Sequence, residues 1–164
     1  MLVHLLLPAL VALQPGSAIP GAIEVHRGTF ILKGLPGPEV IAAMKNAHVT
    51  HVIALCRDTE PGVDVNREAQ RLSDQGISFA RVVLDSAPSI ADFELFRQLR
   101  NTIPKEARVL IHCTNGNRTA AVTVAWLVKE GRVKKQDAIT LARSAGLTQG
   151  DTERAMCRYL GLPM

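Results

Sequence analysis

One cysteine and one arginine, Cys113 and Arg118, enclose a short polar loop that contains Gly116. The apolar run 109–111 before this loop is typical of a buried strand, and the apolar residues of 119–130 recur at helical spacing. Backbone N–H groups of a loop that leads into a helix converge on one place and bind anions there. The same field favours the thiolate form of Cys113, which is the nucleophilic form. Arg118 adds a planar fork that can bind two oxygens of a tetrahedral anion.

Hydrolysis of a phosphomonoester fits this set of groups. A Cys113 thiolate would attack phosphorus and form a phosphocysteine intermediate. Arg118 would hold the charge on the phosphoryl oxygens together with the residues that we expect to bind substrate: Thr114, Asn115, Gly116 and Asn117. A buried structural cysteine beside a surface arginine is the simpler alternative.

The segment His112-Cys113-x4-Arg118-Thr119 resembles the signature of cysteine-dependent protein tyrosine phosphatases, and of the dual-specificity phosphatases in the same superfamily. That signature has five residues between cysteine and arginine, whereas this chain has four. A four-residue spacer is similar to the rhodanese loop and to the loop of bacterial beta-lactamase-hydrolase-like phosphatase domains. The bacterial group fits the chain best, over residues 25–130, including Gly34-Leu-Pro-Gly-Pro-Glu39 before the first expected helix. The resemblance implies an α/β domain with a mainly parallel central sheet flanked by helices.

The same resemblance implies roles for two further residues. Thr119 matches the hydroxyl residue that stabilises the departing cysteine thiolate in those phosphatases; an ordinary hydroxyl in the first turn of a helix is the alternative. The leaving oxygen needs a proton, which these enzymes take from an aspartate on a loop upstream of the signature strand. Asp85 matches that placement best, although it could serve only to form a turn. Asp92 could cap a helix instead, and Asp58 ends a different strand.

Two other functions remain open from the residues alone. A rhodanese-type sulfurtransferase would carry a persulfide on Cys113 without a general acid. The tight loop favours it, whereas Thr114 after the cysteine and His112 before it favour a phosphatase. An inactive module would bind phosphorylated partners without turnover, but it would need neither Cys113 nor an acid. The loop carries no lysine, which favours a phosphoprotein or a small phosphomonoester over a phosphoinositide.

The remaining cysteines suggest redox protection of the nucleophile. Cys56 ends an apolar run at the sheet edge where Cys113 is expected. Related phosphatases sometimes keep a second cysteine there, which captures the oxidised nucleophile as a disulfide; a small buried hydrophobe is the alternative. Cys157 receives no role. The three cysteines lack Cys-x-x-Cys spacing, so we expect no structural metal, no disulfide framework and no cofactor.

Strands and helices alternate along the chain, which predicts a mainly parallel sheet with its ligand site beyond the carboxyl ends of the strands. The patterns predict a hairpin over 23–33 and strands over 51–55, 79–84 and 109–111. They predict helices over 38–47, 64–75, 91–103, 119–130, 135–144 and 151–160. Because these strand ends carry Cys56, Asp85 and the loop 113–118, which we call the signature loop, we expect one active site at this edge.

Length and charge limit the remaining possibilities. With 164 residues, of which 47% are hydrophobic, the chain is long enough for one domain with its own core. The net charge of +4 suits an anionic substrate. The lysines and arginines are interleaved with acids and form no basic stripe, so the sequence predicts no nucleic-acid partner.

Residues 1–18 have the outline of a secretory signal peptide. The apolar run 2–13 is too short to span a bilayer comfortably, and small residues after it place a cleavage point behind Ala18. A first helix or strand packed on the domain is the alternative, because no lysine or arginine precedes the run. We expect one phosphatase-like domain at 19–164 and no stable membrane span. The protein is periplasmic or secreted if the signal peptide is cleaved, and cytoplasmic otherwise.

Overall fold

Within residues 19–163, five strands form one sheet, and the first two of them are a hairpin. The structure is a computed structural model that describes residues 19–163, so the expected signal peptide lies outside the described residues. The strands are β1 (Ala22–His26), β2 (Thr29–Leu32), β3 (His51–Ala54), β4 (Ser78–Arg81) and β5 (Val109–His112). The predicted hairpin is confirmed, because β1 and β2 pair antiparallel on either side of Gly28. Gly28 has a left-handed φ of +72°, which a glycine adopts without strain.

β5 lies at the centre of the sheet. The strand order is β1-β2-β5-β3-β4, and every pairing except that of β1 with β2 is parallel. All residues of β5 are buried between its neighbours β2 and β3. The parallel strands therefore end together at one edge of the sheet, which we call the carboxyl edge; the amino edge lies opposite. The α/β fold with a mainly parallel sheet is confirmed.

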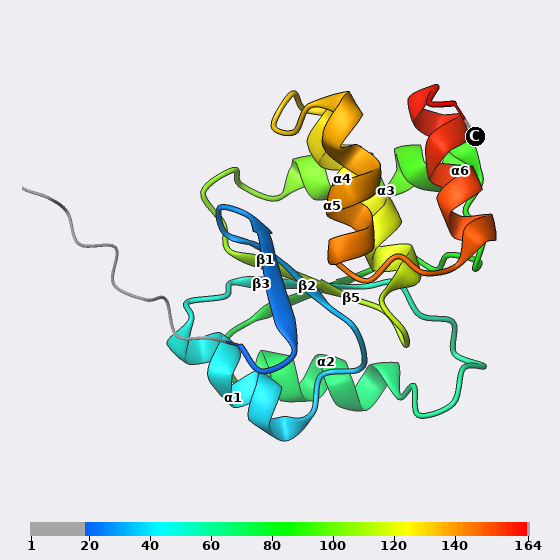
Figure 1. The fold of residues 1–164 in the computed structure, drawn as a ribbon. Coiled ribbons are helices and arrows are strands. Elements are labelled where there is room, and N and C mark those ends of the chain that lie inside the picture. The colour runs from blue at the N-terminus through cyan, green and yellow to red at the C-terminus, as the bar shows by residue number, and fades with distance from the viewer. Residues whose placement is uncertain (1–18, 164) are drawn as a thin grey trace, which may run out of the picture.

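Helices cover both faces of the sheet. They are α1 (Pro38–Asn46), α2 (Val65–Ser73), α3 (Ile90–Thr102), α4 (Asn117–Lys129), α5 (Ala138–Ser144) and α6 (Gly150–Leu160), with the 3₁₀ turn η1 (Lys135–Asp137) before α5. Figure 1 shows α1 and α2 below the sheet and α3 to α6 above it. Among the described residues, no helix has both the length and the apolar character to cross a membrane.

Each face of the sheet has its own hydrophobic core. The core between the sheet and α1 and α2 includes Ile41 and Leu72. The core on the side of α3 to α6 includes Ile111 and Leu127. Every residue of α4 over 117–127 is buried. A helix buried on all sides cannot shift without disturbing its neighbours, so α4 holds the signature loop that precedes it in a fixed position.

The predicted helix over 119–130 begins earlier in the structure, at Asn117. Gly116 precedes it with a left-handed φ of +87°, which turns the chain from the strand direction into the helix within one residue. The signature loop is therefore shorter than the sequence pattern suggests.

The predicted strand over 79–84 ends its regular pairing at Arg81. The chain nevertheless continues beside β3, because the N–H of Val82 donates to the carbonyl of Ala54 at 3.0 Å. The predicted helix over 64–75 is observed as α2, and Asp64 caps it by accepting the backbone N–H of Arg67 at 3.0 Å.

Candidate active site

The sulfur of Cys113 lies inside the turn between β5 and α4. Cys113 is fully buried, and its Sγ accepts the backbone N–H of Gly116 at 3.1 Å. A side chain at Gly116 would be strained by the left-handed φ and would approach Lys33 to 3.1 Å. An N–H donor aimed at the sulfur stabilises negative charge there. One backbone N–H of the loop, that of Gly116, therefore points at the sulfur.

Two asparagines hold the loop in shape. The side-chain oxygen of Asn115 accepts the N–H of Asn117 at 3.1 Å and a weak hydrogen bond from the Cys113 thiol at 3.8 Å. The Asn117 side chain is engaged elsewhere, since its oxygen accepts the backbone N–H groups of Thr148 and Gln149 at 2.7 and 2.8 Å. Asn117 therefore ties the loop to the segment between α5 and α6. The backbone N–H and the side-chain oxygen of Asn117 therefore both have partners within the protein, which does not favour its predicted part in substrate binding.

Arg118 joins the signature loop to two other strand ends. Its side chain is only 5% exposed. Nη1 donates to the backbone carbonyls of Leu55 and Leu84 at 3.1 and 2.9 Å. These residues follow β3 and β4, so the next residues, Cys56 and Asp85, lie at the same edge as the loop.

Glu60 is the residue of this site that the sequence analysis missed. Its two carboxylate oxygens accept from Nη1 and Nη2 of Arg118 at 2.6 and 2.5 Å. One of them also accepts the hydroxyl of Thr114 at 2.6 Å. The Arg118 hydrogen bonds hold the pKa of Glu60 far below its usual range, although burial opposes this shift. Burial lowers the pKa of Arg118, but the Glu60 carboxylate outweighs it and raises that pKa, so both groups stay charged.

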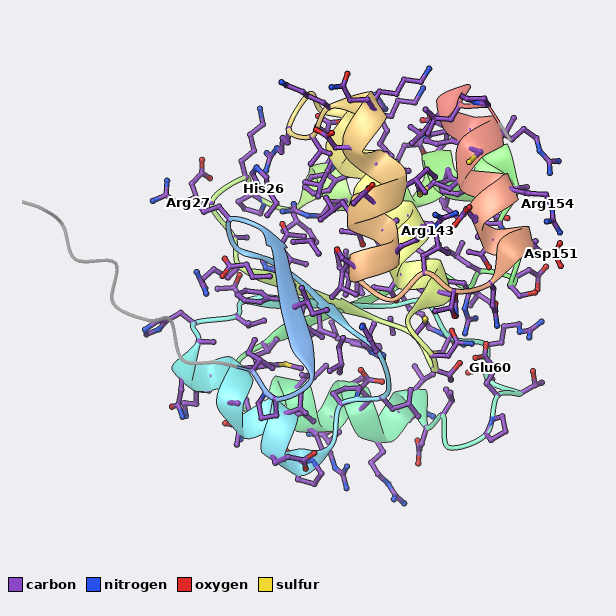
Figure 2. The ribbon with its side chains drawn as sticks, in the orientation of Figure 1. His26, Arg27, Glu60, Arg143, Asp151 and Arg154 are labelled. Atoms are coloured by element: carbon purple, nitrogen blue, oxygen red, sulfur yellow. The ribbon has the colours of Figure 1, made fainter. Side chains whose placement is uncertain are left out.

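Asp85 is exposed and reaches the same cluster through Arg57. Its carboxylate, 75% exposed, accepts from Nη1 of Arg57 at 3.0 Å. Arg57 in turn donates its backbone N–H to Glu60 at 2.9 Å. Figure 2 labels Glu60 at this edge of the sheet. The most favoured candidate acid is thus linked to the arginine of the signature loop by two intermediate residues.

The two alternative acids have other partners. Asp92 forms a capping box with Ser89 at the start of α3, which confirms the helix-cap alternative for this residue. Asp58 is exposed and pairs with Arg81 at 2.9 Å. Neither carboxylate contacts Arg118 or Glu60.

Thr119 and His112 flank the signature loop, and both are fully buried. The Thr119 hydroxyl is fully buried and has no hydrogen-bond partner within residues 19–163. An ordinary hydroxyl of a helix would donate to a carbonyl of the preceding turn, so the Thr119 hydroxyl remains able to donate to a reacting group. Nε2 of His112 lies 2.6 Å from Glu68 of α2, which ties the end of β5 to that helix.

Cys56 lies next to Cys113, and both thiols are free. In the parallel register of β3 and β5, Ala54 is opposite His112. Cys56 comes two residues after Ala54 and Cys113 one residue after His112, so both cysteines follow directly on the ends of neighbouring strands. Burial first, and then the nearby Cys113, raise the pKa of Cys56 to about 12. Cys56 is therefore a neutral thiol at physiological pH.

Comparison with known proteins gives a relative and a set of similar folds. No family model matches the chain. Protein tyrosine phosphatase PRL-1 of Leishmania major is 32% identical over 136 residues, covering 76% of this chain and 74% of that protein. A DUF442 protein from Shewanella putrefaciens CN-32 has a TM-score of 0.72 at 19% identity, over 87% of this chain and 93% of that one. PTPMT1, solved in complex with PI(5)P, has a TM-score of 0.68 at 14% identity, and the match covers 86% of this chain and 95% of PTPMT1.

Sequence and fold define the same class, so this protein is a cysteine-dependent phosphatase. The identity to the Leishmania protein extends over most of both chains. The chain belongs to the protein tyrosine phosphatase family.

Removal of the Glu60 carboxylate should destabilise the fold. Glu60→Ala leaves the Arg118 guanidinium buried without its counter-charge, a change that costs on the order of 3 kcal/mol. Urea unfolding at pH 7 measures the loss. Glu153→Ala is the matched control, because its partner Arg143 is 62% exposed and such pairs contribute little. Equal unfolding midpoints for the two variants would show that Glu60 does not hold Arg118.

The stability that Glu60→Ala loses relative to the wild type should depend on pH, because the pKa of Glu60 is lowered in the folded protein. A carboxyl group whose pKa is lowered in the folded state stabilises the protein at any pH above its pKa in the unfolded state, which is about 4.3. This stabilisation is lost as the pH falls towards the pKa in the folded state. The difference between wild type and Glu60→Ala should therefore be constant from pH 7 to about pH 5 and should shrink only in stronger acid.

Proposed function

We propose that this phosphatase hydrolyses phosphomonoesters through a phosphocysteine on Cys113. The observation that carries the proposal is the hydrogen bond from the Gly116 N–H to the buried Cys113 sulfur, in a loop that ends at Arg118. A thiolate nucleophile is most effective where donors are fixed around it before the substrate binds. This loop is fixed in that way by α4 behind it.

The phosphate would bind to the donors that Arg118 still has free. Nη1 is engaged by two carbonyls and by Glu60, whereas Nε donates to no residue among 19–163. Nη2 also contacts the Thr114 hydroxyl at 3.1 Å. We expect phosphate oxygens to accept from Nε and to replace that hydroxyl on Nη2, which completes a two-point contact. Glu60 acts as a positioning residue that holds the guanidinium by its other edge.

The reaction then runs in two steps. The Cys113 thiolate attacks phosphorus, and the bond from phosphorus to the leaving oxygen breaks. Asp85, after it has turned away from Arg57 and taken up a proton from solvent, donates that proton to the leaving oxygen. Water then cleaves the phosphocysteine and releases inorganic phosphate. The free hydroxyl of Thr119 would stabilise the thiolate as it departs.

A phosphorylated protein or a small phosphomonoester is the substrate that we propose. The relative from Leishmania is named as a protein tyrosine phosphatase. PTPMT1, in contrast, holds a phosphoinositide, PI(5)P. Residues 114–117 of this chain include no lysine to bind further phosphate groups, which favours a substrate with a single phosphate.

The finer family and the location are also part of the proposal. The four-residue spacer and the segment 34–39 support membership of the bacterial beta-lactamase-hydrolase-like phosphatase domains. The apolar run 2–13 followed by small residues supports export.

Substitution of the nucleophile separates the candidate functions. Cys113→Ser should abolish release of p-nitrophenol from p-nitrophenyl phosphate, because a serine hydroxyl is not ionised at neutral pH. Its unfolding midpoint should stay near that of the wild type. Arg118→Lys should also lower kcat/KM strongly, since an ammonium group cannot form the two-point contact.

Thiocyanate formation from thiosulfate and cyanide, without phosphate release, would instead establish a sulfurtransferase. Phosphate binding with neither activity would leave only a binding module.

Substitution of the acid should depend on the leaving group. Asp85→Asn should slow hydrolysis of phenyl phosphate on the order of 10²–10⁴-fold, the usual contribution of a general acid. Hydrolysis of p-nitrophenyl phosphate should fall much less, because its leaving group needs little protonation. Asp58→Asn and Asp92→Asn are the matched controls. The same loss for both substrates would move the acid role away from Asp85.

Cys56 would protect Cys113 from irreversible oxidation. Peroxide converts a thiolate into a sulfenic acid and is itself reduced to water or hydroxide. The Cys56 thiol can then attack that sulfur, so that a disulfide forms and water leaves. Both cysteines are in the same buried cluster at neighbouring strand ends, and the disulfide requires their Cα atoms to lie within about 7 Å of each other.

Peroxide treatment tests this role. Mild hydrogen peroxide should inactivate the wild type reversibly, with full recovery in dithiothreitol, and should inactivate Cys56→Ser irreversibly as Cys113 oxidises further. Cys157→Ser is the control and should behave like the wild type. Recovery of Cys56→Ser to the same extent as the wild type would remove Cys56 from the proposal.

A further inference from the structure

A second cationic pocket lies at the amino edge of the sheet, where α3 and α4 end. Its volume is about 280 Å³, and Arg100, Lys105, Trp126 and Arg132 line it together with Asn101 and Glu130. We call it the amino-edge pocket. Trp126 lies about 14 Å along the axis of α4 from the residue that begins the helix. The pocket is therefore separate from the signature loop.

Arg100 is buried in this pocket with few partners. It is 2% exposed, its Nη1 donates to the carbonyl of Ile103 at 3.3 Å, and its Nε is buried without any partner among the described residues. A buried guanidinium normally has a carboxylate or several acceptors, because an unpaired buried charge is costly. Arg118 is buried to a similar degree and has both Glu60 and two carbonyls.

A second guanidinium faces the same ring. The charged groups of Arg100 and Arg132 lie 4.5 and 5.1 Å from the centre of the Trp126 ring. Burial first, and then the charge of Arg132, lower the pKa of Arg100 to about 10. Cation–π contacts offset part of the cost of burial, but they do not cancel the repulsion between two like charges.

No carboxylate neutralises this pair. The ion pairs formed within residues 19–163 include neither Arg100, Lys105 nor Arg132. Glu130 lines the pocket, but its carboxylate contacts Arg97 at 3.5 Å and Asn101 at 3.2 Å.

The carbonyl groups at the carboxyl ends of α3 and α4 carry partial negative charge. Attraction to these helix ends is a simpler explanation for the cluster of cations than a bound anion. That effect suits exposed cations at a helix end, whereas Arg100 is buried and reaches only one carbonyl.

The neighbouring surface is also basic. A second cavity shares Lys105 with the amino-edge pocket and is lined by Arg27 and Arg108 as well as Glu106. Figure 2 labels Arg27 on the side of the molecule away from Glu60. The amino-edge pocket is much larger than the volume of about 10–15 Å³ that a single water requires. It therefore has room for a hydrated anion.

We propose that the amino-edge pocket binds a small oxyanion, with inorganic phosphate, which the phosphatase reaction releases, as its ligand. A multivalent oxyanion accepts several hydrogen bonds and neutralises both guanidinium groups at once. Lys105 adds a third positive charge at the rim. This site is distinct from the phosphate site at Cys113 and does not depend on the proposed catalytic roles.

Fluorescence of Trp126 tests the proposal, because it is the only tryptophan of the chain. Titration of the full chain with sodium phosphate should give a saturable change in emission, whereas sodium chloride at matched ionic strength should not. Arg118→Met, which removes the active-site arginine and whose folding is checked by circular dichroism because Glu60 loses its partner, should retain the saturable change. Arg132→Met should weaken phosphate binding at this pocket by at least about tenfold, the loss expected for one charged donor. Arg143→Met, a substitution at an exposed arginine away from the pocket, is the control.

Calorimetry supplies a second measurement, because Arg132→Met also changes the surroundings of the fluorophore. The wild type should bind two phosphates, and Arg118→Met and Arg132→Met one each. Turnover of p-nitrophenyl phosphate by Arg132→Met should equal that of the wild type, which also shows that the variant folds. Any of three results would overturn the proposal: no saturation with phosphate, an identical response to chloride, or a single site that Arg118→Met removes and Arg132→Met retains.

Discussion

The carboxyl edge of the sheet depends on one buried charge, the guanidinium of Arg118. Parallel strands end in separate loops. Beyond the last paired residues, single backbone hydrogen bonds such as that from the Leu84 N–H to the Leu55 carbonyl, at 3.4 Å, join neighbouring strand ends, but none of them links all three loops. Arg118 does so by donating to the carbonyls of Leu55 and Leu84 while its own loop encloses Cys113. A buried charge must be neutralised, and Glu60 meets this need with two short hydrogen bonds. The contacts that neutralise the buried Arg118 charge are therefore also the contacts that fix the geometry of the site.

The same contacts connect the arginine of the signature loop to the proposed acid. Glu60 holds Arg118, accepts the backbone N–H of Arg57 and thereby fixes the residue whose side chain binds Asp85. Asp85 itself is mostly exposed, so its position depends on this single ion pair more than on packing. The Arg118 guanidinium is buried, whereas the proposed acid is an exposed side chain with room to turn towards a leaving group.

Much of the fold was predictable from the sequence because it rests on local signals. The alternation of strands and helices predicts the parallel sheet, and the polar loop after residues 109–111 predicts the place of Cys113 and Arg118. Glu60 was not predictable, because Asp58, Glu60 and Asp64 share one loop and no spacing rule shows which of them meets a guanidinium from a distant helix. The start of α4 was missed because helical periodicity begins at Thr119, whereas the helix begins where Gly116 turns the chain.

The four-residue spacer leaves the signature loop one backbone N–H fewer than a five-residue spacer, and side chains complete its internal contacts. Asn115 accepts the N–H of Asn117, and the Thr114 hydroxyl bridges Arg118 and Glu60. These groups are neutral and can exchange partners, so an arriving phosphate replaces hydrogen bonds without leaving a charge unpaired. Gly116 still directs its N–H at the sulfur, which is the contact that a thiolate nucleophile requires. A loop shortened by one residue is therefore compatible with membership of the protein tyrosine phosphatase family.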